Sequence, residues 1–160
     1  MILTMPERSS WASAIGLLII NFGVLDLLVQ DYLEDNLSPE EFSKIRERPF
    51  YVRFDRVKEW VGVADYSLKQ KQSFEKLCMR LEPIRELRNH VAHGILRIGL
   101  AQDQKTWILT LSLSRDLDGS NTPDAMHLDF QELTKALGEL AVLIEDFQKF
   151  TGGWSDAKEL

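Results

Sequence analysis

The segment Ser67–Gly94, SLKQKQSFEKLCMRLEPIRELRNHVAHG, decides the fold because it contains the longest regular helical pattern in the chain. Its apolar residues recur three and four positions apart, as on one face of an α-helix, at Phe74, Leu77, Leu81 and Ile84. We expect this helix to extend to about His93, with Gly94 as its C-terminal cap. Pro83 lacks a backbone N–H and is expected to kink the helix or break one turn.

Arg88 lies on the apolar face of this predicted helix. At about 100° per residue it falls within the arc that contains Ile84 and Val91. A guanidinium is rarely buried without a partner, so Arg88 must meet a carboxylate, a carbonyl or a phosphate. A long arginine side chain can also reach the neighbouring stripe, which holds Glu82, Asn89 and His93.

Two interpretations of these residues are open. In the structural one, His93 and Gly94 end the helix, and the imidazole interacts favourably with the C-terminal end of the helix dipole. Arg88 then pairs with Glu82 or with an acid from another helix. In the chemical one, the same residues form a metal-independent phosphodiesterase site. His93 would deprotonate a ribose 2′-OH near neutral pH, and Arg88 would stabilise charge on the phosphate oxygens.

The other two histidines carry weaker indications of chemistry. His90 is expected to be an exposed partner of Glu86 one turn earlier, although it could serve as a second acid–base group. His127 is expected to be structural, in a loop or a strand. One cysteine and three histidines at these spacings make a weak case for zinc, and the sequence has no Gly-rich phosphate loop. We therefore expect neither a metal nor an organic cofactor.

Helices are also predicted before this segment. Apolar residues at helical spacing predict a first helix from Ser9 or Ser10 to about Glu34. A second helix is expected to begin at Ser38, where a capping serine precedes a proline and two acids, and to end at Pro49. The following stretch, Phe50–Val63, is predicted to be helical or irregular.

After Gly94 the pattern changes from helix to strand. Alternating and β-branched residues predict a β-hairpin formed by Ile95–Leu100 and Thr106–Leu113. A loop is expected over Asp116–Pro123. The last helix is predicted from about Asp129 to Phe150, ended by Thr151-Gly152-Gly153, with a loose tail over residues 151–160.

Length and composition limit the organisation of the chain. At 160 residues and 44% hydrophobic, we expect a single domain over residues 1–160, with its core in about residues 10–150. The single cysteine, Cys78, excludes an intrachain disulfide and favours a reducing, cytoplasmic location. The apolar run Ala12–Val29 contains Asn21 and Asp26, which are costly inside a bilayer. We therefore expect a core helix there and no membrane association.

The charge is unevenly distributed along the sequence. The net charge is -6, yet residues 44–80 contain ten basic and five acidic side chains, which gives +5 there and -11 elsewhere. A basic middle in an acidic protein can face a phosphate backbone. The alternative is an ordinary pair of solvated helices.

The stretch Arg88-Asn89-His90-Val91-Ala92-His93 resembles the motif of HEPN domains, in which an arginine is followed after four to six residues by a histidine. The asparagine after the arginine also matches. The resemblance implies a mainly α, up-and-down helical bundle, here with an inserted β-hairpin before the last helix. It further implies a metal-free endoribonuclease of a toxin–antitoxin, phage-defence or RNA-processing system. The catalytic residues would be Arg88, Asn89 and His93, and two motifs would share one cleft in a homodimer.

The sequence also departs from parts of this family. In one toxin branch a tyrosine that the antitoxin modifies follows two residues after the motif histidine, whereas this chain has Ile95 there. Regulation by that route is therefore not expected, although an antitoxin or another protein partner fits the resemblance. Many similar domains bind a protein or a nucleotide without catalysis. A non-catalytic binding module is accordingly the alternative to a ribonuclease.

Overall fold

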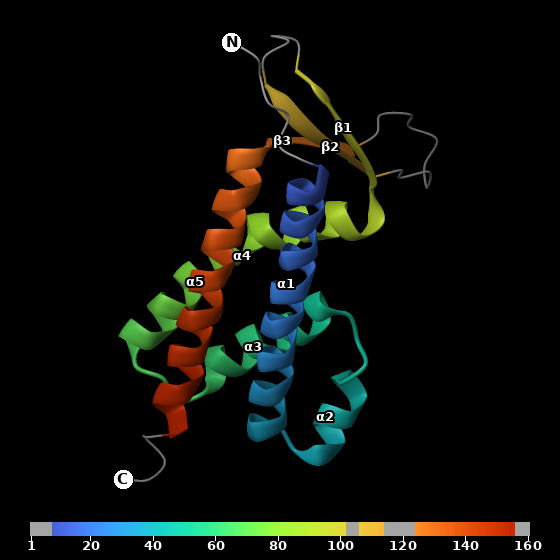
Figure 1. Ribbon diagram of the computed structural model, residues 1–160. Helices are drawn as coiled ribbons and strands as arrows, with labels where there is room; N and C mark the ends of the chain where they lie inside the picture. Colours follow the sequence, from blue (N-terminus) through green and yellow to red (C-terminus); the bar gives the residue numbers. More distant parts are fainter. Residues whose placement is uncertain (1–7, 102–105, 114–123, 156–160) are drawn as a thin grey trace. The chain divides into compact units, whose positions relative to one another are not determined.

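A computed structural model describes residues 8–101, 106–113 and 124–155 of the chain (Figure 1). Over these residues the protein is mainly helical with a small antiparallel sheet, which confirms the predicted class. The elements, in chain order, are α1 (Arg8–Asn36), α2 (Pro39–Ile45), α3 (Phe50–Val63), α4 (Leu68–His93), β1 (Ile95–Leu100), β2 (Trp107–Leu113), β3 (Asp124–Asp129) and α5 (Phe130–Ser155).

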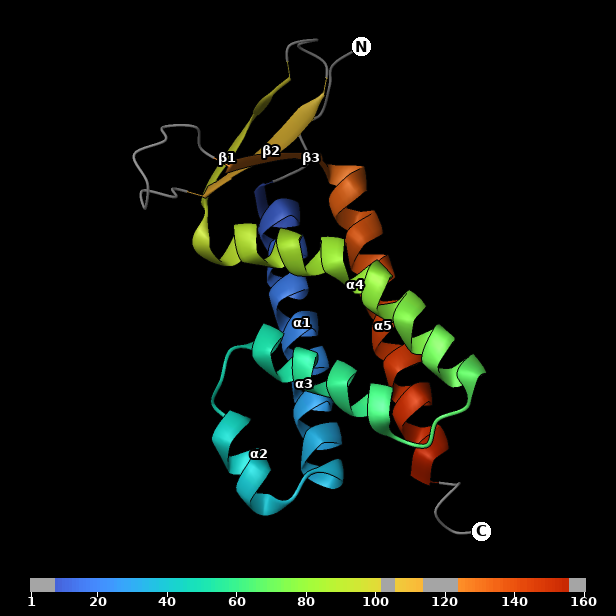
Figure 2. The same cartoon turned by 180° about the vertical axis from the view of Figure 1, so that it is seen from behind.

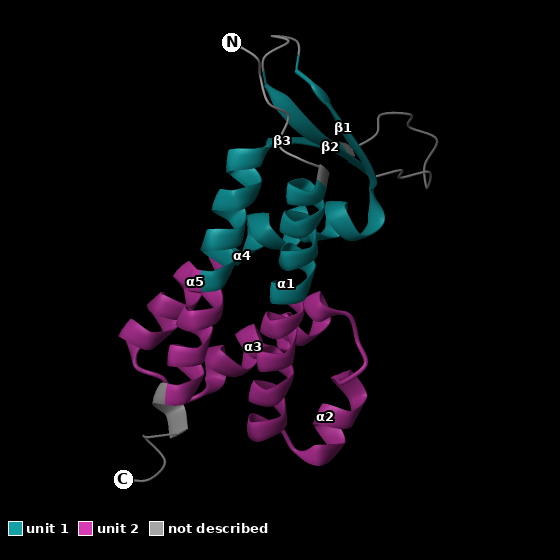
Figure 3. Cartoon of the chain, viewed as in Figure 1, with its two compact units in different colours: residues 1–21, 81–141 teal, residues 22–80, 142–160 magenta. Residues whose placement is uncertain are grey.

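The chain forms two compact units, each assembled from two separate stretches of sequence (Figure 3). Unit 1 contains residues 1–21 and 81–141, and unit 2 contains residues 22–80 and 142–160. The boundaries fall inside α1, α4 and α5, so each of these helices contributes to both units. In α4 the boundary lies near Pro83, which remains inside the helix but leaves the carbonyl of Met79 without its usual helical donor.

The sheet of unit 1 has three antiparallel strands in the order β1-β2-β3 (Figures 1 and 2). The predicted hairpin is present as β1 and β2, with Leu96 opposite Leu111. The prediction of a hairpin alone was wrong, because β3 adds a third strand that pairs Met126 with Leu111. The sequence of β3 has only a weak alternating pattern. Its pairing with β2 is what identifies it as a strand. The predicted loop over residues 116–123 lies outside the described residues.

The two faces of this sheet differ in chemistry. Side chains on alternate residues point to opposite faces, so the register places Leu109 and Leu111 on one face and Thr110 on the other. Leu109 and Leu111 are fully buried, which identifies their face as the one that packs on the rest of unit 1. The core of the unit continues with Trp11, whose ring contacts Phe130 edge to face at 5.0 Å.

Helix α5 begins as predicted but ends later. Asp129 and Glu132 form a reciprocal cap, in which each side chain accepts a hydrogen bond of 2.8 Å from the other residue's backbone N–H. The predicted end at Phe150 was wrong, since the helix continues to Ser155. Gly152 does not adopt the left-handed conformation of a helix-ending glycine. The predicted loose tail is therefore helical up to Ser155, and residues 156–160 lie outside the described residues.

Gly94 joins α4 to β1 and is required by a close approach. Its N–H donates to the carbonyl of His90 at 2.8 Å. A Cβ at this position would overlap the carbonyl oxygen of His90 and lie 3.1 Å from that of Ser112. Gly94 directly follows His93, the last residue of α4, as predicted, and its φ is not in the left-handed region. A glycine is required at position 94 because it has no side chain, and not because of its backbone freedom.

Unit 2 has an aromatic core. Phe54 and Phe74 are buried, and the Phe74 ring lies 5.0 Å from that of Phe150. Tyr32 and Tyr66 are also buried and share a hydrogen bond of 2.9 Å between their hydroxyl groups. Burial raises the pKa of both phenols above the ordinary value. The two hydroxyls therefore stay neutral and satisfy each other inside the core.

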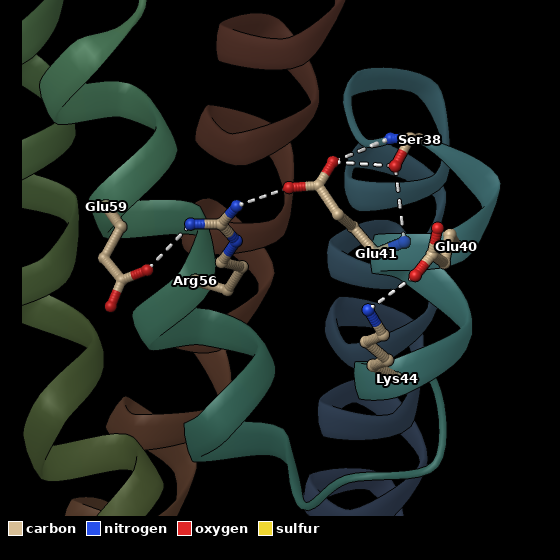
Figure 4. Close-up of polar contacts among 6 residues, drawn as sticks. All are labelled: Ser38, Glu40, Glu41, Lys44, Arg56 and Glu59. Carbon is tan, nitrogen blue, oxygen red and sulfur yellow. Dashed lines mark hydrogen bonds and ion pairs between the residues drawn. The ribbon is translucent and has the colours of Figure 1, made fainter.

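Helix α2 begins as the sequence predicts (Figure 4). The hydroxyl of Ser38 accepts a hydrogen bond of 3.3 Å from the N–H of Glu41, and the Glu41 carboxylate accepts one of 3.2 Å from the N–H of Ser38. Pro39 occupies the first turn, where its missing N–H costs nothing. The helix ends at Ile45, before Pro49. The Ser38 hydrogen bonds to Glu41 lower the pKa of that carboxyl.

Arg53 of α3 is an internal anchor of unit 2. It is only 7% exposed. One guanidinium nitrogen, Nη1, donates to the carbonyl oxygens of Arg46 and Arg48 at 2.9 and 2.5 Å, and Nη2 donates to the carboxylate of Asp26. Arg53 thereby ties the segment between α2 and α3 to α1. Asp26, the acid within the apolar run of the first helix, has this cation as its partner.

Helix α1 is the described helix that is long and apolar enough, by length and composition, to cross a membrane, and an 18-residue window of it has a mean hydropathy of 2.2. Core helices of other proteins pass the same test. One face of α1 is buried, with Leu18 and Leu25 at 0% exposure. Exposed apolar side chains follow another face, at Leu17, Ile20, Val24 and Leu27. The prediction of a core helix therefore describes only one face of α1. The cytoplasmic location stays a prediction.

Cys78 should react slowly with thiol reagents. Burial raises the pKa of its thiol from its ordinary value of 9.0 to about 11. A raised pKa means less thiolate, so at pH 8 we expect alkylation of the folded protein by iodoacetamide to be about 100-fold slower than that of the urea-unfolded chain. Mass spectrometry of timed samples measures both rates. Equal rates in the two states would contradict the burial of this thiol.

Candidate functional site

The predicted motif occupies the last turns of α4 in unit 1. The buried face of this part of the helix contains Leu81, Ile84, Leu87 and Val91. Arg88 and Asn89 are half-buried beside that face. Arg88 is therefore only half-buried, although the helical projection places it within the arc of the apolar stripe. A guanidinium in this position remains partly accessible to solvent.

Asn89 contacts the arginine as part of the same turn. The Nη1 atom of Arg88 donates to Oδ1 of Asn89 at 3.4 Å. This distance is long for a hydrogen bond, so the contact orients the guanidinium more than it restrains it. Asn89 and His93 are four residues apart and share one face of the helix. The contact thus turns the Arg88 side chain toward the face that carries His93.

The two motif histidines have opposite environments. His93, the last residue of α4, is exposed. His90 is 2% exposed, and its Nδ1 lies 3.0 Å from the carbonyl oxygen of Glu86. Because a carbonyl only accepts hydrogen bonds, Nδ1 is the donor in this contact. The expected exposed pair of His90 and Glu86 was wrong, because His90 is buried and its contact is with the backbone carbonyl of Glu86.

An additional arginine, which the sequence reasoning missed, lies one turn before the motif. Arg85 is bonded to the carboxylate of Glu82 through Nη2 and, at 3.2 Å, through Nε. Glu82 was expected to pair with Arg88 or His93, and the structure shows a pair of Glu82 with Arg85 that the sequence did not predict. The spacing of three residues between Glu82 and Arg85 was the available signal. Arg85 thus holds the Glu82 carboxylate near the end of α4 that carries Arg88 and His93.

A polar row crosses the exposed face of the sheet in the same unit. The register aligns Arg97 of β1, Thr110 of β2 and His127 of β3. The Thr110 hydroxyl and Nδ1 of His127 are 3.1 Å apart. His127 has the structural contact that the sequence suggested, but it is also exposed, as is Arg97. Sequence reasoning missed the row because β3 was not predicted as a strand.

Comparison with known proteins adds no family to this picture: no protein-family model, no curated protein and no solved structure matches the chain. The geometry of α4 and the resemblance of its last turns to the HEPN motif therefore carry the functional argument.

Proposed function

We propose that the protein is a HEPN-like, metal-independent endoribonuclease that acts through Arg88, Asn89 and His93. The observation that carries the proposal is the contact of Arg88 with Asn89, which shares one face of α4 with the exposed His93. The buried His90 leaves His93 as the motif histidine that a substrate can reach. An exposed imidazole beside a guanidinium is a combination suited to cleaving phosphodiesters.

The proposed reaction uses the 2′-OH of the RNA itself as the nucleophile. His93 removes the 2′-OH proton, and the oxygen attacks the adjacent phosphorus. The bond from phosphorus to the 5′-oxygen then breaks, and a proton from solvent or from an imidazolium neutralises the leaving 5′-oxygen. Arg88 stabilises the negative charge that develops on the phosphate oxygens, and Asn89 holds the guanidinium toward them. The products are a 2′,3′-cyclic phosphate and a 5′-OH end.

Assembly as a homodimer remains part of the proposal, but its predicted contact needs correction. Ile84 and Val91, expected to form a dimer seam with Arg88, are buried within unit 1 at 5% and 7% exposure. That stripe is consequently covered by the chain itself. Exposed apolar residues on α1, such as Ile20 and Leu27, are better placed to contact a second copy. An antitoxin or another protein is proposed as a further partner, with a toxin or phage-defence role.

The activity itself is the direct test. We expect the purified protein to cleave single-stranded RNA in the presence of EDTA and to leave DNA of the same sequence intact, because attack by an internal 2′-OH requires no metal-activated water. Gel electrophoresis of end-labelled RNA, with mass spectrometry of the new ends, should show cyclic phosphates. If a broad panel of RNAs remains uncut with and without added metals, the ribonuclease proposal fails.

The second candidate is a non-catalytic binding module. The exposed apolar side chains of the edge strand β1 favour it, namely Ile95, Leu96, Ile98 and Leu100. Exposed apolar patches of this kind are typical of protein-binding surfaces. Capture of a defined protein partner through β1, by a chain that leaves every RNA intact, would support this candidate over the enzyme.

A further inference from the structure

The structure locates the part of the basic segment that is available for a ligand. Among residues 44–80, the cations of α2 and α3 have acidic partners, and Figure 4 shows those of Lys44 and Arg56. The pairs are Lys44 with Glu40, Arg53 with Asp26, Arg56 with Glu41 and Glu59, and Lys58 with Asp55. These cations are largely neutralised locally. The other cations of the segment are Lys69, Lys71, Lys76 and Arg80 in the first half of α4, and Arg46 and Arg48 between α2 and α3.

A pocket of about 610 Å³ lies in unit 2 between the first half of α4 and the last part of α5. Its cationic side chains are Lys69, Lys76, Arg80 and Lys149, and its single acidic side chain is Asp146. A volume of this size falls within the usual range for small-molecule sites. The pocket thus combines a net positive charge with room for a small organic ligand.

The cations of the pocket differ in how they are held. Nη1 of Arg80 donates to the Asp146 carboxylate at 2.7 Å, and Nζ of Lys149 lies 3.7 Å from Glu145. No hydrogen bond or ion pair joins the ammonium groups of Lys69 and Lys76 to another residue within the described ranges. Lys69 and Lys76 are seven residues apart and so lie on the same face of α4. Both ammonium groups can therefore turn toward one anion.

The interior of the pocket is apolar and aromatic. Phe74 and Leu77 of α4 are buried there, and Phe150 of α5 is half-buried beside them. The rings of Phe74 and Phe150 are 5.0 Å apart at a tilt of 31°. A fully hydrated inorganic anion gains little from such a surface. A ligand with a charged group and an attached ring or apolar body gains from both parts.

We propose that this pocket binds a phosphate ester attached to an aromatic or apolar body, with the phosphate between Lys69 and Lys76 and the body against Phe74 and Phe150. Arg80, held by Asp146, lines the same pocket and adds a fixed positive charge. The phosphate ester can belong to a free small molecule or to a nucleic-acid strand. The site is separate from the Arg88 motif, because every residue that lines it belongs to unit 2.

The test is a calorimetric or NMR titration of the full-length protein with phenyl phosphate. We expect saturable binding that is tighter than that of glycerol 3-phosphate or inorganic phosphate, because only phenyl phosphate offers a ring to the pocket. Phenol, which lacks the charge, should bind more weakly still. Changing Lys76→Gln should weaken phenyl phosphate binding about 10-fold, the usual value of one charge-assisted hydrogen bond. Lysine and glutamine have similar helix propensity, so the fold should be retained.

Lys44→Gln is the matched control. It removes one positive charge from the same unit, but Lys44 pairs with Glu40 at 2.9 Å and does not line the pocket. Its affinity for phenyl phosphate should equal that of the wild type within about twofold, as expected for an exposed paired charge.

The source of the phosphate is distinguished by a second ligand. A single-stranded DNA hexamer, which has no 2′-OH to be cleaved, should compete with phenyl phosphate if the pocket takes nucleic acid and should not compete if it takes a free phosphate ester. Either result supports a phosphate-ester site. The proposal is overturned if phenyl phosphate shows no saturable binding up to about 10 mM, or if Lys69→Gln/Lys76→Gln binds it as well as the wild type. Neither result depends on the ribonuclease activity.

Discussion

Changing His93→Ala is expected to slow RNA cleavage by about 100-fold or more, which is the usual contribution of a positioned acid–base group. The side chain is exposed at the end of α4, so its removal should leave the fold intact. Single-turnover cleavage of a labelled RNA measures the rate, and circular dichroism with thermal melting verifies the fold. Changing Arg88→Ala should cost a similar factor, because the guanidinium is proposed to stabilise the charged transition state.

His127 and His90 are the controls for this prediction. His127→Ala removes an exposed histidine from the same unit and should leave the cleavage rate within about twofold, as a group outside the reacting atoms should. His90→Ala empties a buried position and should lower the melting temperature while preserving the rate per folded molecule. A His93→Ala protein that cleaves RNA as fast as the wild type would remove His93 from the mechanism.

Changing Arg53→Ala is expected to destabilise the protein by about 3 kcal/mol, as is typical when one member of a buried ion pair is removed. The side chain is 7% exposed, and its loss leaves the Asp26 carboxylate and the carbonyls of Arg46 and Arg48 without their donors. Urea unfolding followed by circular dichroism gives the free energy of unfolding. The rate of the proposed RNA cleavage at low urea should be unaffected, because Arg53 belongs to unit 2.

Arg56→Ala provides the comparison for Arg53. Arg56 pairs with Glu59 at 2.9 Å and Glu41 at 3.2 Å, but all three side chains are at least one-third exposed. Exposed pairs of this kind contribute at most about 1 kcal/mol. If Arg53→Ala and Arg56→Ala lower the free energy of unfolding equally, burial of the Arg53 network does not stabilise unit 2 as described.

Local signals predicted the helices well. Ser38 and Pro39 set the start of α2, and the predicted stretch Phe50–Val63 is α3, because caps and prolines act on their own neighbours in sequence. Gly152 misled the prediction of the end of α5, since a glycine followed by another glycine can also continue a helix. The third strand escaped prediction because its partner β2, rather than its own pattern, defines it.

The sequence predicted which residues make up the candidate site, but not how deeply each of them is buried. The proposed orienting role of Asn89 agrees with its contact with Arg88, which adjacent residues can make without help from the fold. The burial of His90 depends on tertiary packing, which no helical projection contains. The pocket around Lys76 requires α5 beside α4, so the sequence revealed only its excess of basic residues.

The division of each unit between distant stretches has a consequence for synthesis on the ribosome. Residues 1–21 emerge first, but their unit also requires residues 81–141. Residues 22–80 must likewise wait for residues 142–160, which belong to the same unit. The apolar face of α1 therefore stays without its native neighbours until these later residues have been synthesised. A nascent chain in this state is a natural client for a chaperone until α5 leaves the exit tunnel.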